Sequence, residues 1–171
     1  MPNAETHDYI TVLTAVAGNA LYFAFAPKPD IQLSLLFSGT YLLAGYACAG
    51  DLDLDSKEYR RWGRLRFLWY PYKQLMPHRS RLSHGLILGG VIRACYLATI
   101  CTLVFWLSLW LYSRLGPHVD ATAATQQQWQ SVNALVRDKP RWAGALLSGF
   151  ILAGTTHSIA DTISTWFKRQ F

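Results

Sequence analysis

The chain has 171 residues, which suits a single domain of residues 1–171, and it carries a formal net charge of +6. Its basic residues crowd beside long apolar runs, as in membrane proteins, and this placement argues against nucleic acid as a partner. The three cysteines lie in apolar segments without a CxxC pair, which argues against a disulfide framework and against a cysteine-ligated zinc site. The first eight residues lack Lys and Arg, so we expect no cleaved signal peptide.

Four apolar segments, taken in chain order, predict an all-α fold, a polytopic membrane bundle of about four helices. The predicted spans are residues 10–26, 31–50, 86–112 and 142–160. A helix needs roughly 20 apolar residues to cross a bilayer, which the second and third segments provide, whereas the first and fourth are shorter. Because Trp and Tyr prefer the membrane interface, the aromatic residues at the span ends favour this fold over a soluble helical bundle. These residues are Trp106, Trp110, Tyr112 and Trp142.

The distribution of Lys and Arg between the loops predicts how the spans are oriented. The side that carries both termini holds ten, namely Lys57, Arg60, Arg61, Arg64, Arg66, Lys73, Arg79, Arg81, Lys168 and Arg169. The opposite side holds five, namely Lys28, Arg114, Arg137, Lys139 and Arg141. Since cytoplasmic loops carry the excess of basic residues, we expect an integral, multi-pass protein with both termini in the cytoplasm. Arg93, inside the third span, is expected to snorkel back towards that side. The polar, Gln-containing segment 116–141 is expected to be a mobile loop.

A basic, aromatic loop follows the second span on the predicted cytoplasmic side. Between Tyr59 and Tyr70 this loop mixes cations with large aromatic side chains. Such a segment can lie in the headgroup plane and bind anionic lipid, which is the interpretation we prefer beside membrane spans. The alternatives are an ordinary solvated loop and a nucleic-acid patch, in which arginine grips phosphate and aromatic rings stack on bases.

Acidic and histidine side chains gather at the predicted cytoplasmic face, next to each of the four spans. The candidate metal ligands are His7, Asp51, Asp53, His78, His84, His157 and Asp161. Carboxylates near apolar surface lose solvation and repel one another, and a divalent cation relieves both effects while accepting neutral imidazoles. The mixture of His and Asp suits zinc first, with manganese or ferrous iron as alternatives, and the number of candidates allows one or two ions.

Each of these motifs has a simpler explanation when it is taken alone. The DLDLD run of residues 51–55 is often a solvated turn or a helix cap, although in an extended turn its three carboxylates would all point inwards. His157 and Asp161 share a helix face at i and i+4, and could simply form a hydrogen bond. Neighbouring Ser and His residues suggest a serine hydrolase, but the sequence contains no GxSxG motif. The metal-site hypothesis therefore rests on the convergence of the motifs.

The order of the motifs resembles a known family. The resemblance rests on Thr6-His7-Asp8, on residues 50–56 (GDLDLDS) and 59–63 (YRRWG), on His78-Arg79-Ser80 with Ser83-His84-Gly85, and on His157-Ser158 with Asp161-Thr162. These residues are similar to those of a bacterial family of metal-binding membrane proteins of unknown function, related to the YdjM-like membrane-bound metal-dependent hydrolases. The resemblance implies a helical membrane protein with a metal site near the cytoplasmic face and a hydrolase activity. Gly50 stands where those hydrolases usually have proline, so the resemblance implies metal binding more strongly than catalysis.

Three functions are compatible with these residues. The first is a metal-dependent hydrolase of a phosphoester or lipid-like substrate. In that enzyme His7 and His78 would complete the metal shell or act as general acid or base, and Arg79 would offset substrate charge. The second is a non-catalytic membrane protein that stores, senses or structurally uses its ion, which a closed coordination shell would favour. A transporter ranks last, because the polar groups lie at one end of the spans rather than at mid-membrane.

Overall fold

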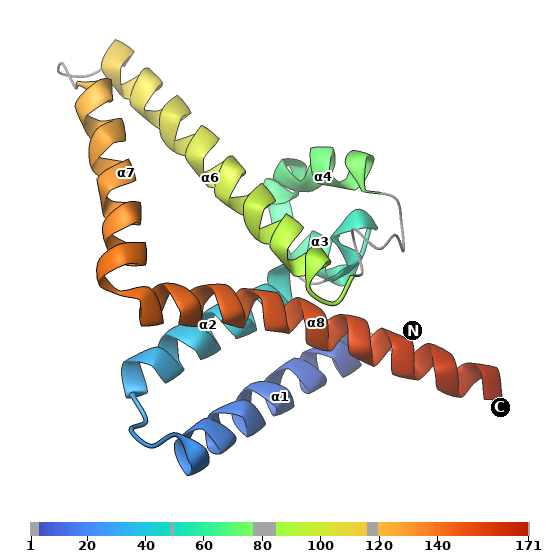
Figure 1. The fold of residues 1–171 in the computed structure, drawn as a ribbon. Helices are drawn as coiled ribbons and strands as arrows, with labels where there is room; N and C mark the ends of the chain where they lie inside the picture. The colour runs from blue at the N-terminus through green and yellow to red at the C-terminus, as the bar shows by residue number, and fades with distance from the viewer. Residues whose placement is uncertain (1–3, 49, 77–84, 116–119, 171) are drawn as a thin grey trace.

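The computed structural model describes residues 4–48, 50–76, 85–115 and 120–170, and all regular structure within these ranges is helical. The long helices are α1 (Ala4–Phe25), α2 (Ile31–Ala47), α6 (Leu88–Leu115), α7 (Ala121–Asp138) and α8 (Pro140–Gln170). Short helices between α2 and α6 are η1 (Gly50–Asp53), α3 (Lys57–Arg61), η2 (Gly63–Trp69) and α4 (Tyr70–Leu75). The predicted all-α fold is confirmed for the described residues (Figure 1).

Helices α1, α2 and α8 form the centre of the fold, and α2 packs along α8 (Figure 1). Glycines bring these helices close together. A Cβ atom at Gly149 of α8 would lie 2.6 Å from the carbonyl oxygen of Phe37 on α2, and one at Gly45 of α2 would meet Thr11 of α1. Any larger residue at these positions would push the helix axes apart, and small residues are the usual means by which apolar helices approach closely.

Helix α6 contacts α8 through its first turns and then diverges from it (Figure 1). Gly90 lies against the backbone of Ile151, and the Thr155 hydroxyl donates a hydrogen bond to the carbonyl oxygen of Leu86. From Leu103 onwards most apolar side chains of α6 are exposed. The described residues therefore form a three-helix centre to which α6 is attached near one end.

The segment that was expected to be a mobile loop contains a helix, so that prediction was wrong. The carboxylate of Asp120 caps α7 by accepting hydrogen bonds from two backbone N–H groups of its first turn. Neither Gly nor Pro interrupts the 18 residues of α7, and Ala, Gln and Arg favour a helix. Trp129, Val132 and Val136 recur at intervals of three and four residues, which is the amphipathic spacing that the loop interpretation overlooked.

The basic, aromatic segment folds into short helices with a buried and an exposed side. Trp69 and Tyr72 are buried, and Trp69 stacks on Tyr96 of α6 with ring centroids 5.3 Å apart. The exposed side carries Arg64, Leu65, Arg66, Phe67 and Tyr70. Gly63, with a φ of 53°, makes the turn from α3 into η2. Some of the aromatic residues are thus core residues, and the others remain exposed beside the cations.

Arg93 lies inside the protein and is only 1% exposed, so the prediction that it snorkels towards the membrane surface was wrong. Its guanidinium packs against Gly154 of α8, and its charge acts on the phenol of Tyr72 in α4. Burial raises the pKa of the Tyr72 phenol, and the neighbouring Arg93 opposes this rise. The charge of Asp53 also acts on Tyr72, which places a buried cation and a buried anion around one hydroxyl group.

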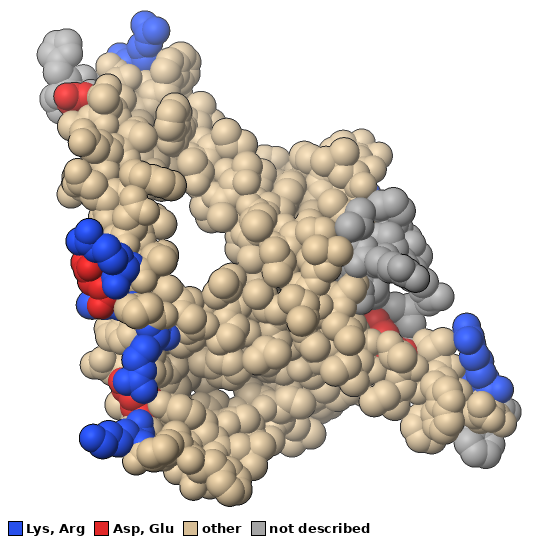
Figure 2. Space-filling model, viewed as in Figure 1, with Lys and Arg blue, Asp and Glu red and all other residues tan. Residues whose placement is uncertain are grey.

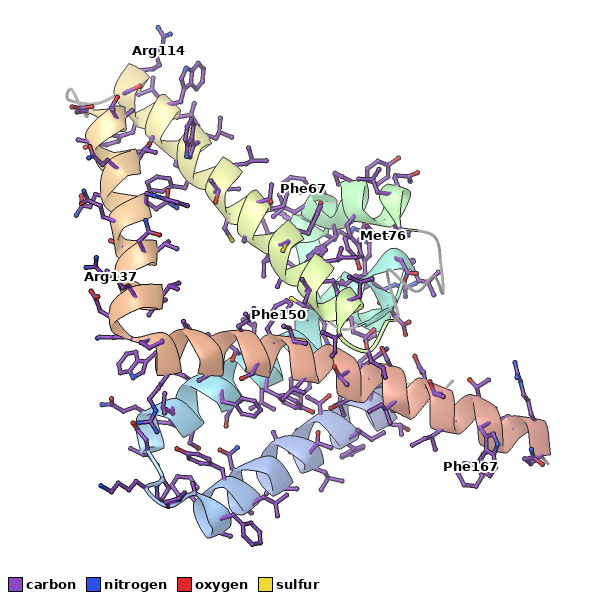
Figure 3. All side chains as sticks on the ribbon, viewed as in Figure 1. Phe67, Met76, Arg114, Arg137, Phe150 and Phe167 are labelled. Atoms are coloured by element: carbon purple, nitrogen blue, oxygen red, sulfur yellow. The ribbon has the colours of Figure 1, made fainter. Side chains whose placement is uncertain are left out.

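Four helices are long and apolar enough to cross a membrane, namely Glu5–Phe25, Ile31–Asp53, Leu88–Leu115 and Pro140–Gln170. Large apolar side chains are exposed along all four. In Figure 2, charged side chains lie along the left edge of the view and near the C-terminal end of α8. The surface between these two regions carries almost no charged side chains. Arg114 and Arg137 lie far from Phe167, which is near the C-terminal end of α8 (Figure 3).

Candidate metal centre

His7 is placed by the first turns of α1. This helix begins at Ala4, six residues before the predicted span, so the histidine belongs to the helix rather than to a preceding loop. Its carbonyl oxygen accepts a hydrogen bond from the Thr11 hydroxyl one turn later, and Thr11 in turn packs on Gly45 of α2. The His7 side chain is buried, with 5% of the residue exposed.

His157 and Asp161 are placed by α8, which continues to Gln170 and thus ten residues beyond the predicted span. Both side chains are buried and lie one helical turn apart on the same face. The rings of His7 and His157 stack with centroids 4.0 Å apart and an interplanar angle of 20°. Residues from opposite ends of the sequence therefore meet where the start of α1 crosses the second half of α8.

The ligand atoms of His7, His157 and Asp161 all lie within 4.8 Å of one another. The Nε2 atom of His7 is 3.2 Å from Oδ1 of Asp161, and Nε2 of His157 is 3.4 Å from Oδ2 of the same carboxylate. In a tetrahedral zinc site with bonds of about 2.0–2.1 Å, two ligand atoms lie about 3.3 Å apart. The two separations between histidine nitrogens and carboxylate oxygens match the edges of such a coordination shell.

The same atoms have no hydrogen-bond partner in the described part of the chain. Both Nε2 atoms and both oxygens of Asp161 are buried, and their short contacts lack hydrogen-bond geometry. Burying a polar group without a partner costs about 1–3 kcal/mol, and more when the group is charged. A divalent cation would accept the two ring nitrogens and an oxygen of Asp161 as ligands, so the donor set fits the metal that the sequence predicts.

Asp51 lies at the edge of this group, with its Oδ2 atom 3.6 Å from Nε2 of His157. Asp53 is buried on another side of η1, near Tyr72 and Arg93. The expectation that the three carboxylates of the DLDLD run point the same way was wrong. Residues 50–53 form a 3-10 helix rather than an extended turn, so alternate positions diverge.

Asp55 points into solvent, where its carboxylate accepts hydrogen bonds from Arg60, one of them with a donor–acceptor distance of 2.8 Å. That bond and the charge of Arg60 lower the pKa of the Asp55 carboxyl. The last carboxylate of the run is therefore an exposed ion-pair partner. The remaining predicted site residues, His78, Arg79 and His84, lie outside the described residues.

Arg61, which the sequence did not single out as a site residue, connects α1, α2 and α3 beside the candidate metal centre. Arg61 of α3 binds the carboxylate of Asp8, with 2.9 Å between Nη1 and Oδ1, and also donates to the carbonyl oxygen of Tyr46 at 2.8 Å. The hydrogen bond with Asp8 raises the pKa of Arg61. The indole of Trp62 donates to the carbonyl oxygen of Ala47 at 2.7 Å. The YRRWG motif therefore fixes the end of α2 and the start of α1, a role that its spacing alone did not reveal.

Comparisons with known proteins agree with this geometry. The family model described as "Uncharacterized metal-binding protein (DUF2227)" matches residues 2–171. An "Uncharacterized protein" of Aquifex aeolicus (strain VF5) is 29% identical over 130 residues, which cover 75% of this chain and 89% of the relative. No solved structure matches the chain. Since the family model covers nearly the entire sequence, the chain belongs to the uncharacterized metal-binding protein family DUF2227.

Proposed function

We propose that this protein is an integral membrane protein that binds a divalent cation through His7, His157 and Asp161 and hydrolyses a phosphoester at the membrane surface. The observation that carries the proposal is the group of buried ring nitrogens and carboxylate oxygens that face one another and have no hydrogen-bond partner within the described ranges. Zinc is the first choice of ion, with manganese and ferrous iron as alternatives, because His and Asp ligands suit all three.

The lengths of two helices support a position of the centre near one membrane surface. At 1.5 Å per residue, His157 lies about 26 Å along α8 from Pro140, and His7 lies about 27 Å along α1 from Phe25. The hydrocarbon core of a bilayer is about 30 Å thick. If Pro140 and Phe25 lie at one membrane surface, the metal centre lies close to the second surface. The excess of Lys and Arg on that side favours the cytoplasm.

The three protein ligands found among the described residues support a catalytic rather than a structural role for the ion. Catalytic zinc sites commonly have three protein ligands and one open position, whereas structural sites have four. A bound divalent cation would lower the pKa of a coordinated water and polarise a phosphoryl oxygen. Asp51 is more exposed than the three buried ligands, so its carboxylate is placed to accept a proton on the accessible side. His78 and Arg79 keep their proposed roles in proton transfer and in neutralising the substrate.

The contact between Asp51 and His157 also supports a second candidate function. The Asp51 carboxylate is 3.6 Å from Nε2 of His157. A small movement of this side chain towards the ion would make Asp51 a fourth protein ligand. A closed shell would leave no position for water or substrate. The protein would then store or sense its ion, or use it to hold α1, α8 and η1 together.

Metal analysis of the protein purified in detergent tests metal binding. We expect about one equivalent of metal in the wild type and in Asp55→Asn, whose side chain lies in solvent, and a large loss in His157→Ala. Asp55→Asn is a matched control because it removes a carboxylate of the same DLDLD run. Equal metal content in the wild type and His157→Ala would refute the proposed centre.

Asp51→Asn separates the two candidate functions. For the hydrolase, this substitution should preserve the metal content and lower the turnover of a generic phosphodiester by roughly 100-fold or more, as for loss of a general base. For the closed shell, it should lower metal affinity, and the wild type should show no turnover. Metal content and phosphodiester hydrolysis are therefore measured on the same preparations.

A further inference from the structure

A groove between α1 and α8 runs along the outside of the candidate metal centre. Its lining includes Thr6, Ile10 and Thr14 from α1 and Thr156, Ile159 and Ile163 from α8, and its volume is about 490 Å³. Ligand sites in proteins commonly have volumes of about 300–1,000 Å³. The groove is thus large enough to hold part of a small molecule, and its walls are mainly apolar.

The groove and the metal centre share their walls. Thr6 precedes His7 on α1, and the lining residue Ala160 precedes Asp161 on α8. Neighbouring residues of a helix point roughly 100° apart, so the groove residues lie on the flank of the turns that carry the metal ligands. A molecule lying in the groove would have one end at the level of the metal centre.

A hydrogen-bonded cluster lies at the Thr14 end of the groove. The hydroxyl groups of Thr14 and Tyr41 are 2.7 Å apart, and Tyr41 donates to Thr156 at 2.7 Å. Thr14 and Thr156 belong to the groove lining, whereas Tyr41 is buried on α2. From Thr6 to Thr14 the groove extends about 12 Å along α1. Between these ends Ile10, Ile159 and Ile163 present hydrocarbon surface.

Cations lie near the end of the groove at the metal centre. Lys57 is 3.8 Å from Asp8, which follows the ligand His7, and Arg61 binds the same carboxylate. The negative charges of Asp161 and Asp51 would be balanced by one divalent cation. Asp8 and Glu58 offset the charges of Lys57 and Arg61, so the divalent cation itself is the main attraction for an anionic group, and a phosphate is a common ligand of such ions.

We propose that the groove holds the hydrocarbon tail of a single-chain anionic amphiphile whose phosphate head lies at the metal centre. This inference rests on the proposed function and specifies its substrate class as a lipid phosphoester. The groove adds little affinity within a bilayer, because lipid tails are as apolar as the isoleucines that line it. Its role is orientation, because a tail held along α1 and α8 fixes the position of the phosphoester at the metal.

Photocrosslinking in phospholipid nanodiscs tests the inference. The probe is a long-chain alkyl phosphonate, which contains no ester bond to hydrolyse, with a diazirine at the middle of its chain. We expect crosslinks to concentrate in residues 6–14 and 156–164 rather than on the exposed surface of α6. A long-chain alcohol with the same diazirine serves as the control that lacks the anionic head group. We expect it to label α6 and the groove in proportion to their exposed surface.

A matched pair of tryptophan substitutions locates the tail. Ile159 and Leu152 are 44% and 45% exposed and lie two turns apart on α8, but only Ile159 lines the groove. Filling the groove with Ile159→Trp should lower crosslinking in residues 6–14 by about fivefold or more. Leu152→Trp should leave it unchanged.

The outcomes separate this inference from the proposed function. Bound metal together with equal labelling by the phosphonate and the alcohol would overturn the inference and leave the metal centre intact, because the groove would then hold bulk lipid only. Unchanged crosslinking in Ile159→Trp would also overturn it. Absence of metal from the wild type would overturn the proposed function itself, and metal content is therefore measured on each nanodisc sample.

Discussion

The imidazole rings of His7 and His157 stack 4.0 Å apart, although they come from opposite ends of the sequence. Both rings direct Nε2 towards the single carboxylate of Asp161. This arrangement joins the first turns of α1 to the second half of α8 through groups that lack hydrogen bonds with each other. Metal binding should therefore contribute to the stability of the fold as well as to chemistry.

Metal should stabilise the protein against heat, because an ion that binds only the folded state shifts the unfolding equilibrium. At a free concentration 100 times the Kd, the expected gain is about 2.7 kcal/mol. Removing a ligand with His7→Ala should abolish this gain, whereas Asp138→Asn, at the end of α7, should preserve it. The measurement is the melting temperature in detergent with zinc and with a chelator. A zinc-dependent shift of equal size in His7→Ala would contradict the assigned ligand.

Gly149→Ala should destabilise the protein by about 1–3 kcal/mol, the usual cost of overpacking. Its new methyl group would lie 2.6 Å from the carbonyl oxygen of Phe37, so α2 and α8 would have to separate. Gly144→Ala is the matched control on the same helix, because nothing lies within 4 Å of its Cβ position. There alanine should stabilise the helix by up to about 1 kcal/mol. Denaturation in detergent compares the two variants, and equal stabilities would mean that the helices are not in close contact.

Arg61 and Arg60 should differ in importance although they are adjacent. Arg61→Ala removes hydrogen bonds to Asp8 and to the Tyr46 carbonyl, and should cost about 1 kcal/mol after solvent screening. Arg60→Ala removes an exposed pair with Asp55 and should have no measurable effect on stability. We also expect weaker metal binding in Arg61→Ala, because α1 carries both Asp8 and His7. Zinc titration and thermal melting of both variants provide the measurement.

Arg93 and Asp53 should behave as a coupled pair in a double-mutant cycle. Both charges act on the phenol of Tyr72 in a buried environment, and removing one buried charge from such a cluster costs about 3–5 kcal/mol. Arg93→Met and Asp53→Asn should each be strongly destabilising, and the double variant should recover much of the loss. Additive losses in chemical denaturation would show that the two residues act independently.

The four apolar helices could be predicted from the sequence because their hydrophobicity is a local property, and the alternating direction of the spans predicted that their site-bearing ends converge. The positions of the helix ends could not. His7 and Asp161 lie beyond the predicted limits of their spans, since α1 and α8 continue through polar residues past the apolar segments. Hydropathy marks where a helix is apolar rather than where it ends.

The finer errors have physical causes in particular residues. The separation of Asp51 from Asp53 depends on the 3-10 geometry of residues 50–53, which a DLDLD pattern does not reveal. The burial of Arg93 depends on the space above Gly154, 61 residues further along the chain. Helix α7 was missed because its Gln and Thr residues resemble a polar linker, although Asp120 is a regular N-cap. Local backbone geometry decided the first case, a tertiary contact decided the second, and local capping decided the third.

The uninterrupted course of α8 has a consequence for the membrane environment. One rigid helix carries Trp142 near its start, and His157 and Asp161 further along. If Trp142 anchors this end at the lipid–water interface, the distance to the ligands is fixed, and any mismatch with bilayer thickness must appear as a change of tilt or as a vertical displacement of the ligands. In a thinner bilayer, His157 and Asp161 would lie closer to the aqueous phase. In a thicker bilayer, they would lie deeper, among the acyl chains. Lipid chain length would thus act on the centre mechanically, through the helix that carries it.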